Sequence, residues 1–326
     1  MYKIKQKMDD FFVEEEIELD LSSNIKDYTY FILEKRDWNT NDAIKAIASK
    51  LRIKPNRINV AGIKDKKAIT RQYVSVYKIS RKEIENVNIK GLTLQFIGYS
   101  NERLKLGQIK SNRFIIVVRN LDEEAEKIDF IENYFDDQRF GNINPIVGNA
   151  LIKKEFRKAC YTLKLKWDKG DYVNPLRNLG KKLLRFYINS YQSLLFNEVL
   201  NIYFSKKYKE FKEIEYEYGE FIFSNENINN IKVPILGFLT EFENKEIELL
   251  YTELMKKYKI KKEDFIIKQI PEISSEGNER DLIVKIKNLK CTYEKDESSK
   301  GKLKAILEFS LPPGSYATLV VKKMFG

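Results

Sequence analysis

The 326-residue sequence contains no histidine. This absence excludes Ser-His-Asp and Cys-His nucleophile pairs, imidazole general bases and nearly all transition-metal sites. The sequence also lacks a GxxxxGK[ST] or GxGxxG phosphate-binding loop. Any chemistry must therefore use carboxylates, lysines, tyrosines or hydroxyls, and we expect neither a metal nor a cofactor.

Cysteines and long apolar segments are also scarce. The two cysteines, Cys160 and Cys291, are far apart, which favours a reducing compartment and argues against a disulfide framework or a zinc site. Apolar runs such as 114–118 are strand-sized, well below the ~20 residues that a bilayer requires. No apolar segment follows the first lysines, so we expect no secretion signal. These features predict a cytoplasmic protein without a membrane partner.

Basic charge is the main compositional feature that is present. The chain has 59 Lys and Arg residues against 48 Asp and Glu residues, a formal net charge of +11. This excess suits a nucleic acid partner, although a generically basic protein fits it equally well. A single core rarely grows beyond ~250–300 residues, so the length favours two lobes. We expect the chain to be a monomer.

Strand and helix patterns are mixed irregularly over the first 140 residues. We expect strands at 10–19, 28–35, 58–61, 72–77, 92–99 and 113–119, and helices at 43–51 and 123–135. Because these elements lack regular strand–helix–strand alternation, the sequence predicts an α+β fold with a mixed or antiparallel central sheet.

The middle of the chain has helical periodicity, and strand patterns return at the end. We expect helices at 150–164 and 181–206, strand-like runs near 220–223 and 233–239, and strands at 282–287, 302–310 and 317–322. This arrangement predicts a discontinuous catalytic domain, 1–147 with 276–326. A second α+β domain is expected to be inserted at 148–275.

One carboxylate lies within a strongly basic stretch. Eight Lys and Arg residues occur between Lys50 and Arg71, and Asp65 is the only acidic residue among them. Nearby cations, Lys64 among them, favour the ionised carboxylate that a nucleophile or base requires, and they would attract a phosphate backbone. A solvated loop in which Asp65 only balances charge also explains the pattern, so this spacing alone does not establish catalysis.

Two further segments have side chains suited to RNA. Asn112 and Phe114 open an apolar strand, where they could contact and stack on a flipped base, or simply cap a turn and enter the core. Gln138 and Arg139 are hydrogen-bond donors suited to a phosphate or a base edge. A helix that ends at Gly141 would explain the same pair without function.

Six segments taken together resemble the TruD family of tRNA pseudouridine synthases. They are Asp10 to Glu15, Gly62 to Gln72, Asn112 to Phe114, Asn133 to Gly141, Ser190 to Asn197, and Leu311 to Thr318. The resemblance extends over nearly the whole chain. Its most specific part is the G-x-K-D-x-x-A-x-T-x-Q string that begins at Gly62.

The resemblance implies an enzyme that converts a D-arm uridine of tRNA, commonly the thirteenth nucleotide, to pseudouridine. Asp65 falls on the catalytic aspartate of the family, and Phe114 falls on the aromatic residue that stacks on the target uracil. Asn112 falls on an asparagine that sets the local conformation or contacts the base. Lys64, Arg71, Gln138 and Arg139 are the further candidate contacts to tRNA. The resemblance also implies that the inserted domain is a TRUD domain.

Two departures from the family pattern and two alternative functions remain. Many relatives have glycine where Asp136 stands, from which we expect a different local turn, and residues 206–262 match no motif. A non-catalytic, basic RNA-binding or RNA-chaperone protein would use the same charged surface without Asp65. An RNA methyltransferase is the alternative among enzymes, but no glycine-rich cofactor loop supports it.

Overall fold

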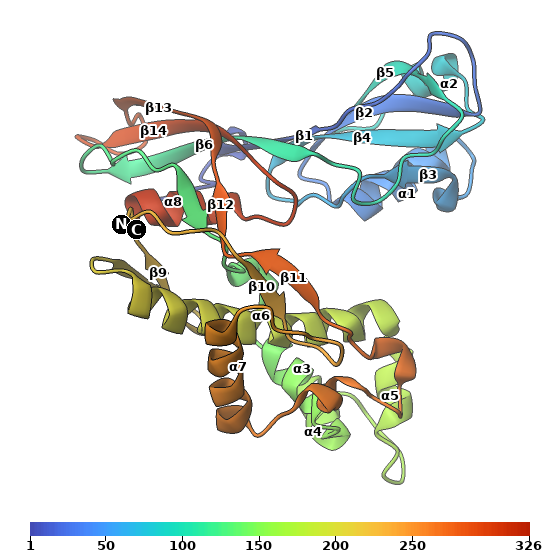
Figure 1. Ribbon diagram of the computed structural model, residues 1–326. Coiled ribbons are helices and arrows are strands. Elements are labelled where there is room, and N and C mark those ends of the chain that lie inside the picture. The colour runs from blue at the N-terminus through green and yellow to red at the C-terminus, as the bar shows by residue number, and fades with distance from the viewer. The chain divides into compact units, whose positions relative to one another are not determined.

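The computed structural model describes residues 1–326, which form two compact units (Figure 1). Unit 1 comprises residues 1–129, 285–317 and 324–326, and unit 2 comprises residues 130–284 and 318–323. Both units are therefore discontinuous in sequence. Compact units defined by contacts are not domain limits, so the limits expected from the sequence, with an insertion at 148–275, stay a prediction.

Unit 1 contains an eight-stranded sheet in the order β13-β14-β6-β1-β4-β2-β5, with β3 paired to β4. The strands are β1 (Phe11–Glu16), β2 (Tyr28–Arg36), β3 (Ile58–Val60), β4 (Ile69–Tyr77), β5 (Leu92–Ser100), β6 (Ser111–Leu121), β13 (Lys287–Lys295) and β14 (Leu303–Leu311). Strands β1 and β4 run parallel, whereas the other pairs are antiparallel. The predicted α+β class with a mixed sheet is confirmed.

Helix α1 (Thr40–Lys50) packs against this sheet. It begins where the Asn39 side chain accepts a hydrogen bond from the Asp42 amide at 2.8 Å, which satisfies a helix N-terminal donor. Its buried Ala43 and Ile47 join the same apolar cluster as Phe31 of β2. The short elements of unit 1 are η1 (Met8–Asp10), η2 (Pro55–Arg57) and α2 (Arg81–Glu85).

Unit 2 is mainly helical, with short strand pairs. Its helices are α3 (Asn144–Ile152), α4 (Phe156–Thr162), α5 (Val173–Asn178), α6 (Lys181–Lys207), α7 (Lys245–Tyr258), η3 (Asp137–Arg139), η4 (Lys262–Phe265) and η5 (Pro271–Ile273). Helices α3 and α6 approach closely at Gly148, where a Cβ atom would lie 2.1 Å from the Tyr187 carbonyl oxygen. No helix of the chain has both the length and the apolar character that crossing a bilayer would require.

The strand pairs of unit 2 lie around these helices. They are the hairpin β8 (Lys212–Tyr216) with β9 (Gly219–Phe223), β10 (Lys232–Ile235) with β11 (Asn278–Asp281), and β7 (Phe130–Glu132) with β12 (Ile283–Lys285), whose last residue belongs to unit 1.

Several predicted elements were wrong. Residues 123–135 are not helical: Ile128 and Phe130 are buried on either side of an exposed Asp129, a spacing of two residues that fits an extended chain, and β7, which follows, is buried throughout. Residues 317–322 are not a strand but part of helix α8 (Ala317–Phe325), because packing of its apolar face outweighs the β-propensity of its Thr and Val residues.

Two further differences concern unit 2. The helix expected at 150–164 is broken at Lys154, which has a left-handed φ of 59° and separates α3 from α4. Within residues 206–262 the sequence prediction contained strands only, whereas α7 is a helix. Its Ile247, Leu250, Tyr251 and Leu254 are buried at a helical spacing.

A buried ion pair fixes α8 within unit 2. The Lys323 ammonium lies 3.1 Å from Oε2 of Glu132, and both side chains are almost fully buried. Glu132 also accepts hydrogen bonds from the Tyr208 hydroxyl at 3.0 Å and the Ser224 amide at 3.1 Å. The Lys323 ammonium lies 3.8 Å from the centroid of the Phe130 ring. Removal of either charge would therefore leave the other buried without its partner.

We predict that Lys323→Met lowers the free energy of unfolding by about 3–5 kcal/mol, because Glu132 then remains as an uncompensated buried charge. Denaturation in guanidinium chloride measures this change. The double variant Glu132→Gln/Lys323→Met removes both charges and should recover much of the loss. A loss below about 1 kcal/mol for Lys323→Met would show that the pair does not hold the helix.

Candidate active site

The loop between β3 and β4, residues 61–68, is tied to the sheet by buried polar side chains. The Gln72 carboxamide donates to the Gly62 carbonyl at 3.3 Å. The Thr40 hydroxyl donates to Oε1 of Gln72 at 3.0 Å and accepts from the Lys64 amide at 3.0 Å. Because Thr40 and Gln72 are fully buried, these hydrogen bonds fix the backbone of the β3–β4 loop.

Lys35 is the third buried side chain that binds this loop. Its ammonium donates to the carbonyl oxygen of Asp65 at 2.5 Å and to that of Trp38 at 2.7 Å. Burial lowers the pKa of Lys35 to about 8. The Asp65 carboxylate opposes this shift, whereas the nearby Lys64 charge lowers the pKa further. The main chain of Asp65 is therefore held by a fully buried amine.

The side chain of Asp65 is accessible although its backbone is fixed. It is 51% exposed, and its Oδ2 atom lies 3.8 Å from the ammonium of Lys5. Lys5 in turn lies over the ring of Phe11, 4.2 Å from its centroid. The geometry thus presents a carboxylate to solvent beside a cation that comes from the N-terminal segment.

Lys64 points into a buried polar cluster. Its ammonium lies 3.1 Å from Oε1 of Glu15 and donates to Oδ1 of Asn112 at 2.5 Å. Oε2 of Glu15 accepts from the Tyr73 amide at 2.9 Å. Burial raises the pKa of Glu15, and the Lys64 charge opposes that shift. The structure therefore brings Lys64 and Asn112 together, as internal partners of Glu15.

Phe114 lies in the same region but is largely covered, with 7% of its surface exposed. Its ring centroid lies 5.5 Å from that of Phe309 and 6.4 Å from that of Phe11. Because Phe11 also contacts Lys5, one series of contacts leads from the Asp65 carboxylate through Lys5 and Phe11 to Phe114. Asp65 and Phe114 are thus two ends of a continuous cluster.

Arg71 does not join this cluster. It follows Thr70 and precedes Gln72 in β4, so its side chain points to the opposite face of the sheet. There its Nη1 atom lies 3.0 Å from Oε1 of Glu14. The remaining candidates, Gln138 and Arg139, belong to η3 of unit 2.

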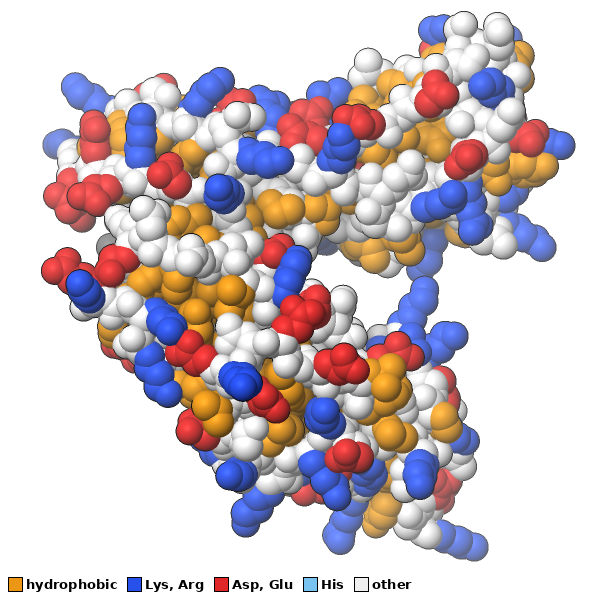
Figure 2. All heavy atoms as spheres, viewed as in Figure 1, with side chains coloured by type: hydrophobic (Ala, Val, Ile, Leu, Met, Phe, Trp, Pro, Cys, Tyr) orange, Lys and Arg blue, Asp and Glu red, His pale blue; other side chains and the backbone are white.

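The excess of basic residues forms no single continuous patch on the face that Figure 2 shows. Lys and Arg side chains are spread over both units and are interspersed with Asp and Glu. The net charge therefore raises the affinity for a polyanion in general, whereas specific binding must depend on local arrangements of residues.

Comparison with known proteins identifies the family. The family model described as tRNA pseudouridine synthase D (TruD) matches residues 2–166 and 161–324. The chain belongs to this family. The predicted membership and the enzyme class, an isomerase of the pseudouridine synthase type, are thereby confirmed.

Individual TruD relatives are similar over almost their whole length. The tRNA pseudouridine synthase D of Aquifex aeolicus is 29% identical, over 99% of this chain and 98% of the relative. A protein of Methanosarcina acetivorans named a probable tRNA pseudouridine synthase D is 28% identical, over 98% and 92%. A crystal structure assigned to TruD of Methanosarcina mazei superposes with a TM-score of 0.74 at 25% identity, over 99% and 93%.

Asp136, at which a different local turn was expected from the sequence, forms contacts of its own. Its backbone φ of −91° is extended and suits any residue. Its buried carboxylate accepts hydrogen bonds from Lys322, at 2.6 Å, and from the Thr318 hydroxyl of α8. Asp136 thus links the start of η3 to the C-terminal helix within unit 2.

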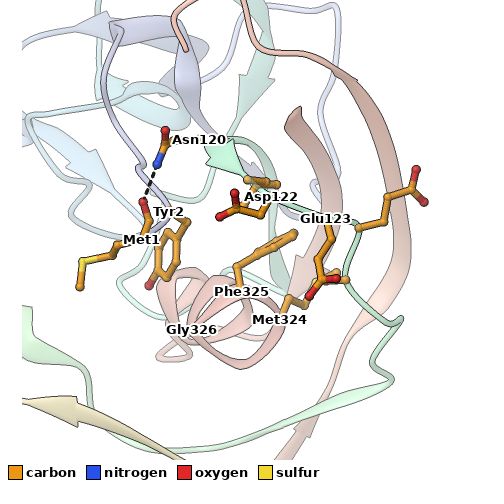
Figure 3. A pocket seen from close by; sticks show the side chains of 11 residues that line it. Met1, Tyr2, Asn120, Asp122, Glu123, Met324, Phe325 and Gly326 are labelled. Atoms are coloured by element: carbon orange, nitrogen blue, oxygen red, sulfur yellow. Dashed lines mark hydrogen bonds between the residues drawn. The ribbon is translucent and has the colours of Figure 1, made fainter. Parts of the chain in front are cut away.

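A pocket in unit 1 provides a contrast to this site (Figure 3). It has a volume of about 240 Å³ and lies where Met1 and Tyr2 meet residues 120–125 and the C-terminal residues. The Asn120 carboxamide donates to the Met1 carbonyl at 2.9 Å at its edge. Three acidic residues, 122–124, contribute to the lining, so this pocket is poorly suited to a phosphate backbone.

The sequence prediction missed Lys5, Lys35 and Thr40. One usable signal was present for Lys35, because Phe31, Leu33 and Lys35 alternate on the buried face of β2. A lysine at a position that the alternation assigns to an apolar residue indicates a buried polar contact. No comparable pattern identified Lys5 or Thr40.

We predict that Lys35 makes stability increase with pH above about 8. Its pKa is about 8 in the folded chain and near its ordinary value of 10.5 when unfolded. Between these values the unfolded state binds more protons, so the free energy of unfolding rises, by up to about 1.4 kcal/mol per pH unit.

Urea denaturation at several pH values between 7 and 10 measures this effect in the wild type and in Lys35→Met. The difference between the two proteins cancels most other titrating groups. Parallel pH profiles for the two proteins would contradict the assignment of this shift to Lys35.

Proposed function

We propose that this TruD-family enzyme converts a uridine in the D-arm of tRNA, commonly the thirteenth nucleotide, to pseudouridine, with Asp65 as the catalytic carboxylate. The observation that supports this proposal most directly is the accessible side chain of Asp65 on a backbone fixed by Lys35. A reacting group must be held within a fraction of an ångström while it remains open to the substrate.

The reaction requires no oxidant, reductant or energy source. The bond between N1 of uracil and C1′ of ribose breaks, the base turns, and C5 bonds to C1′. C5 loses a proton and N1 gains one, so the atoms of substrate and product balance. Asp65 would act on the ribose or the base, as a nucleophile or as a general base, and both roles use the ionised carboxylate.

The target uridine must leave the base stack before it can react. We propose that the extruded uracil contacts Phe114 and Asn112. Phe11 and Phe309 hold the Phe114 ring in one orientation, so the base would pack against the part of the ring that stays accessible. Lys64 similarly fixes the Asn112 carboxamide. Such preorganised side chains reduce the entropy lost when the base binds.

We predict that Asp65→Asn binds unmodified tRNA with an affinity within about threefold of the wild type but makes no measurable pseudouridine. The amide has the shape of the carboxylate and lacks its charge and basicity. Carbodiimide mapping of treated tRNA measures the product, and filter binding measures the affinity. The exposed Asp20→Asn removes the same charge elsewhere in unit 1 and serves as the matched control.

The wild type and Asp20→Asn should be equally active. Normal turnover by Asp65→Asn would remove Asp65 from the mechanism. Absence of pseudouridine in tRNA treated with the wild type would contradict the proposed substrate itself.

We also predict that Phe114→Leu lowers kcat/KM by about fivefold or more, since stacking on an aromatic ring contributes about 1–3 kcal/mol per base. Phe31→Leu is the matched control, because it removes a fully buried ring of unit 1 that belongs to the apolar cluster under α1, which does not include Phe114. Both variants should lose similar stability in thermal melts. Equal effects on kcat/KM would assign Phe114 to the core alone.

A further inference from the structure

Unit 2 contains a polar pocket that the proposed chemistry does not use. It has a volume of about 350 Å³ and is lined by residues from the η3 region, from α6 and from the segment around β11. This volume is at the lower end of the range for small-molecule sites. The pocket is therefore large enough for one compact polar group and its immediate neighbours.

Two arginines are fixed against one aromatic ring in this pocket. The guanidinium carbons of Arg280 and Arg139 lie 4.3 and 5.5 Å from the centroid of Phe135. Arg280 donates from Nε to the Asn133 carbonyl at 2.8 Å and from Nη2 to its side chain at 2.6 Å. Arg139 donates from Nε to the Ser193 hydroxyl at 3.1 Å. Both guanidinium groups are thus oriented by the protein before any ligand binds.

Carboxamide groups contribute to the rest of the lining. Gln192 is buried and donates to the Leu236 carbonyl at 2.6 Å, which fixes that side of the pocket. The Asn189 side chain lies one helical turn earlier on α6 and forms no hydrogen bond within the chain. Asn278 adds an exposed carboxamide from β11. The lining is therefore rich in donors and suits a ligand rich in acceptors.

The backbone around the pocket is held by two glycines. A Cβ atom on Gly237 would lie 2.2 Å from the Gly277 nitrogen, so the two segments cross in direct contact. Gly277 has a φ of +96°, and a Cβ atom there would lie 2.8 Å from the Ile235 carbonyl oxygen. This crossing holds the segment with Asn278 and Arg280 beside α6. The pocket is consequently part of the fold and does not depend on a loose loop.

We infer that this pocket binds one unpaired nucleotide of the RNA substrate, with its phosphate at Arg139 and Arg280 and its base edge at Asn189 and Asn278. The inference rests on the proposed function, because RNA is the substrate class assigned there. Guanidinium groups bind phosphate oxygens through paired hydrogen bonds, and carboxamides can bind the edges of bases. One carboxylate, Glu279, lies in the lining, and the two arginines outweigh it in charge.

Charge substitutions of equal size test this inference. Asn189→Asp and Asn278→Asp each place a carboxylate in the pocket without a change in side-chain volume. We expect each to raise the Kd for unmodified tRNA by about 10-fold at fixed salt, a change of about 1.4 kcal/mol. The slope of log Kd against log salt should fall by about one ion, because the added carboxylate offsets one of the two arginine charges that bind the phosphate.

Asn227→Asp is the matched control, since it introduces the same charge at an exposed position of unit 2 outside the pocket. It should bind tRNA like the wild type and with the same salt dependence. Asn278 is exposed, so its variant is expected to fold, which a thermal melt checks. Binding by both pocket variants that matches Asn227→Asp would overturn the inference.

The failures of the two proposals can be told apart. A wild type that makes pseudouridine, together with pocket variants of normal affinity, would refute only the nucleotide pocket. A wild type that binds tRNA without forming product would refute the proposed reaction. Even then, the comparison of the Asp variants would decide whether the pocket binds RNA.

Discussion

The interaction on which the candidate site depends is the hydrogen bond from the buried Lys35 ammonium to the Asp65 carbonyl. Burial of an ammonium group is unfavourable, and the lowered pKa of Lys35 reflects that cost. Bonds to the Asp65 and Trp38 carbonyls offset part of it. The main chain of Asp65 is therefore held from inside the protein, while the carboxylate of the same residue is exposed to solvent.

The same constraint explains why this face of the sheet is less apolar than its position suggests. Lys35, Thr70 and Gln72 occupy inward-facing positions of β2 and β4 that would ordinarily carry apolar side chains. Lys35 and Gln72 bind the backbone of the β3–β4 loop. These two inward-facing positions therefore position the loop and do not bury apolar side chains. A local departure from the burial pattern is what we expect where structure serves a site.

Local sequence patterns predicted those strands and helices whose structure follows from their own residues. Strand β1 alternates apolar and acidic residues, β2, β4 and β6 contain strand-sized runs of aromatic and β-branched residues, and α1 has a cap at Asn39, so each was predicted near its observed position. The patterns failed at 123–135 and 317–322, where the contacts of each segment decided its structure. Asp65 and Lys64 stand in a recognisable motif, whereas Lys5 and Lys35 reach Asp65 across 60 and 30 residues of sequence, a proximity that only the pairing of strands creates.

Electrostatic conditions around Asp65 follow from which cations are already paired. Lys64 is adjacent in sequence, but its ammonium is paired with Glu15 and bonded to Asn112, and is 10% exposed. Lys5 and Lys35 approach Asp65 directly, one beside its carboxylate and one at its carbonyl. Basic residues counted along the sequence therefore overstate the local charge that acts on a given carboxylate. The field at a carboxylate is set mainly by nearby cations that lack another anionic partner. A cation that is already paired contributes less, because the fields of the paired charges largely cancel.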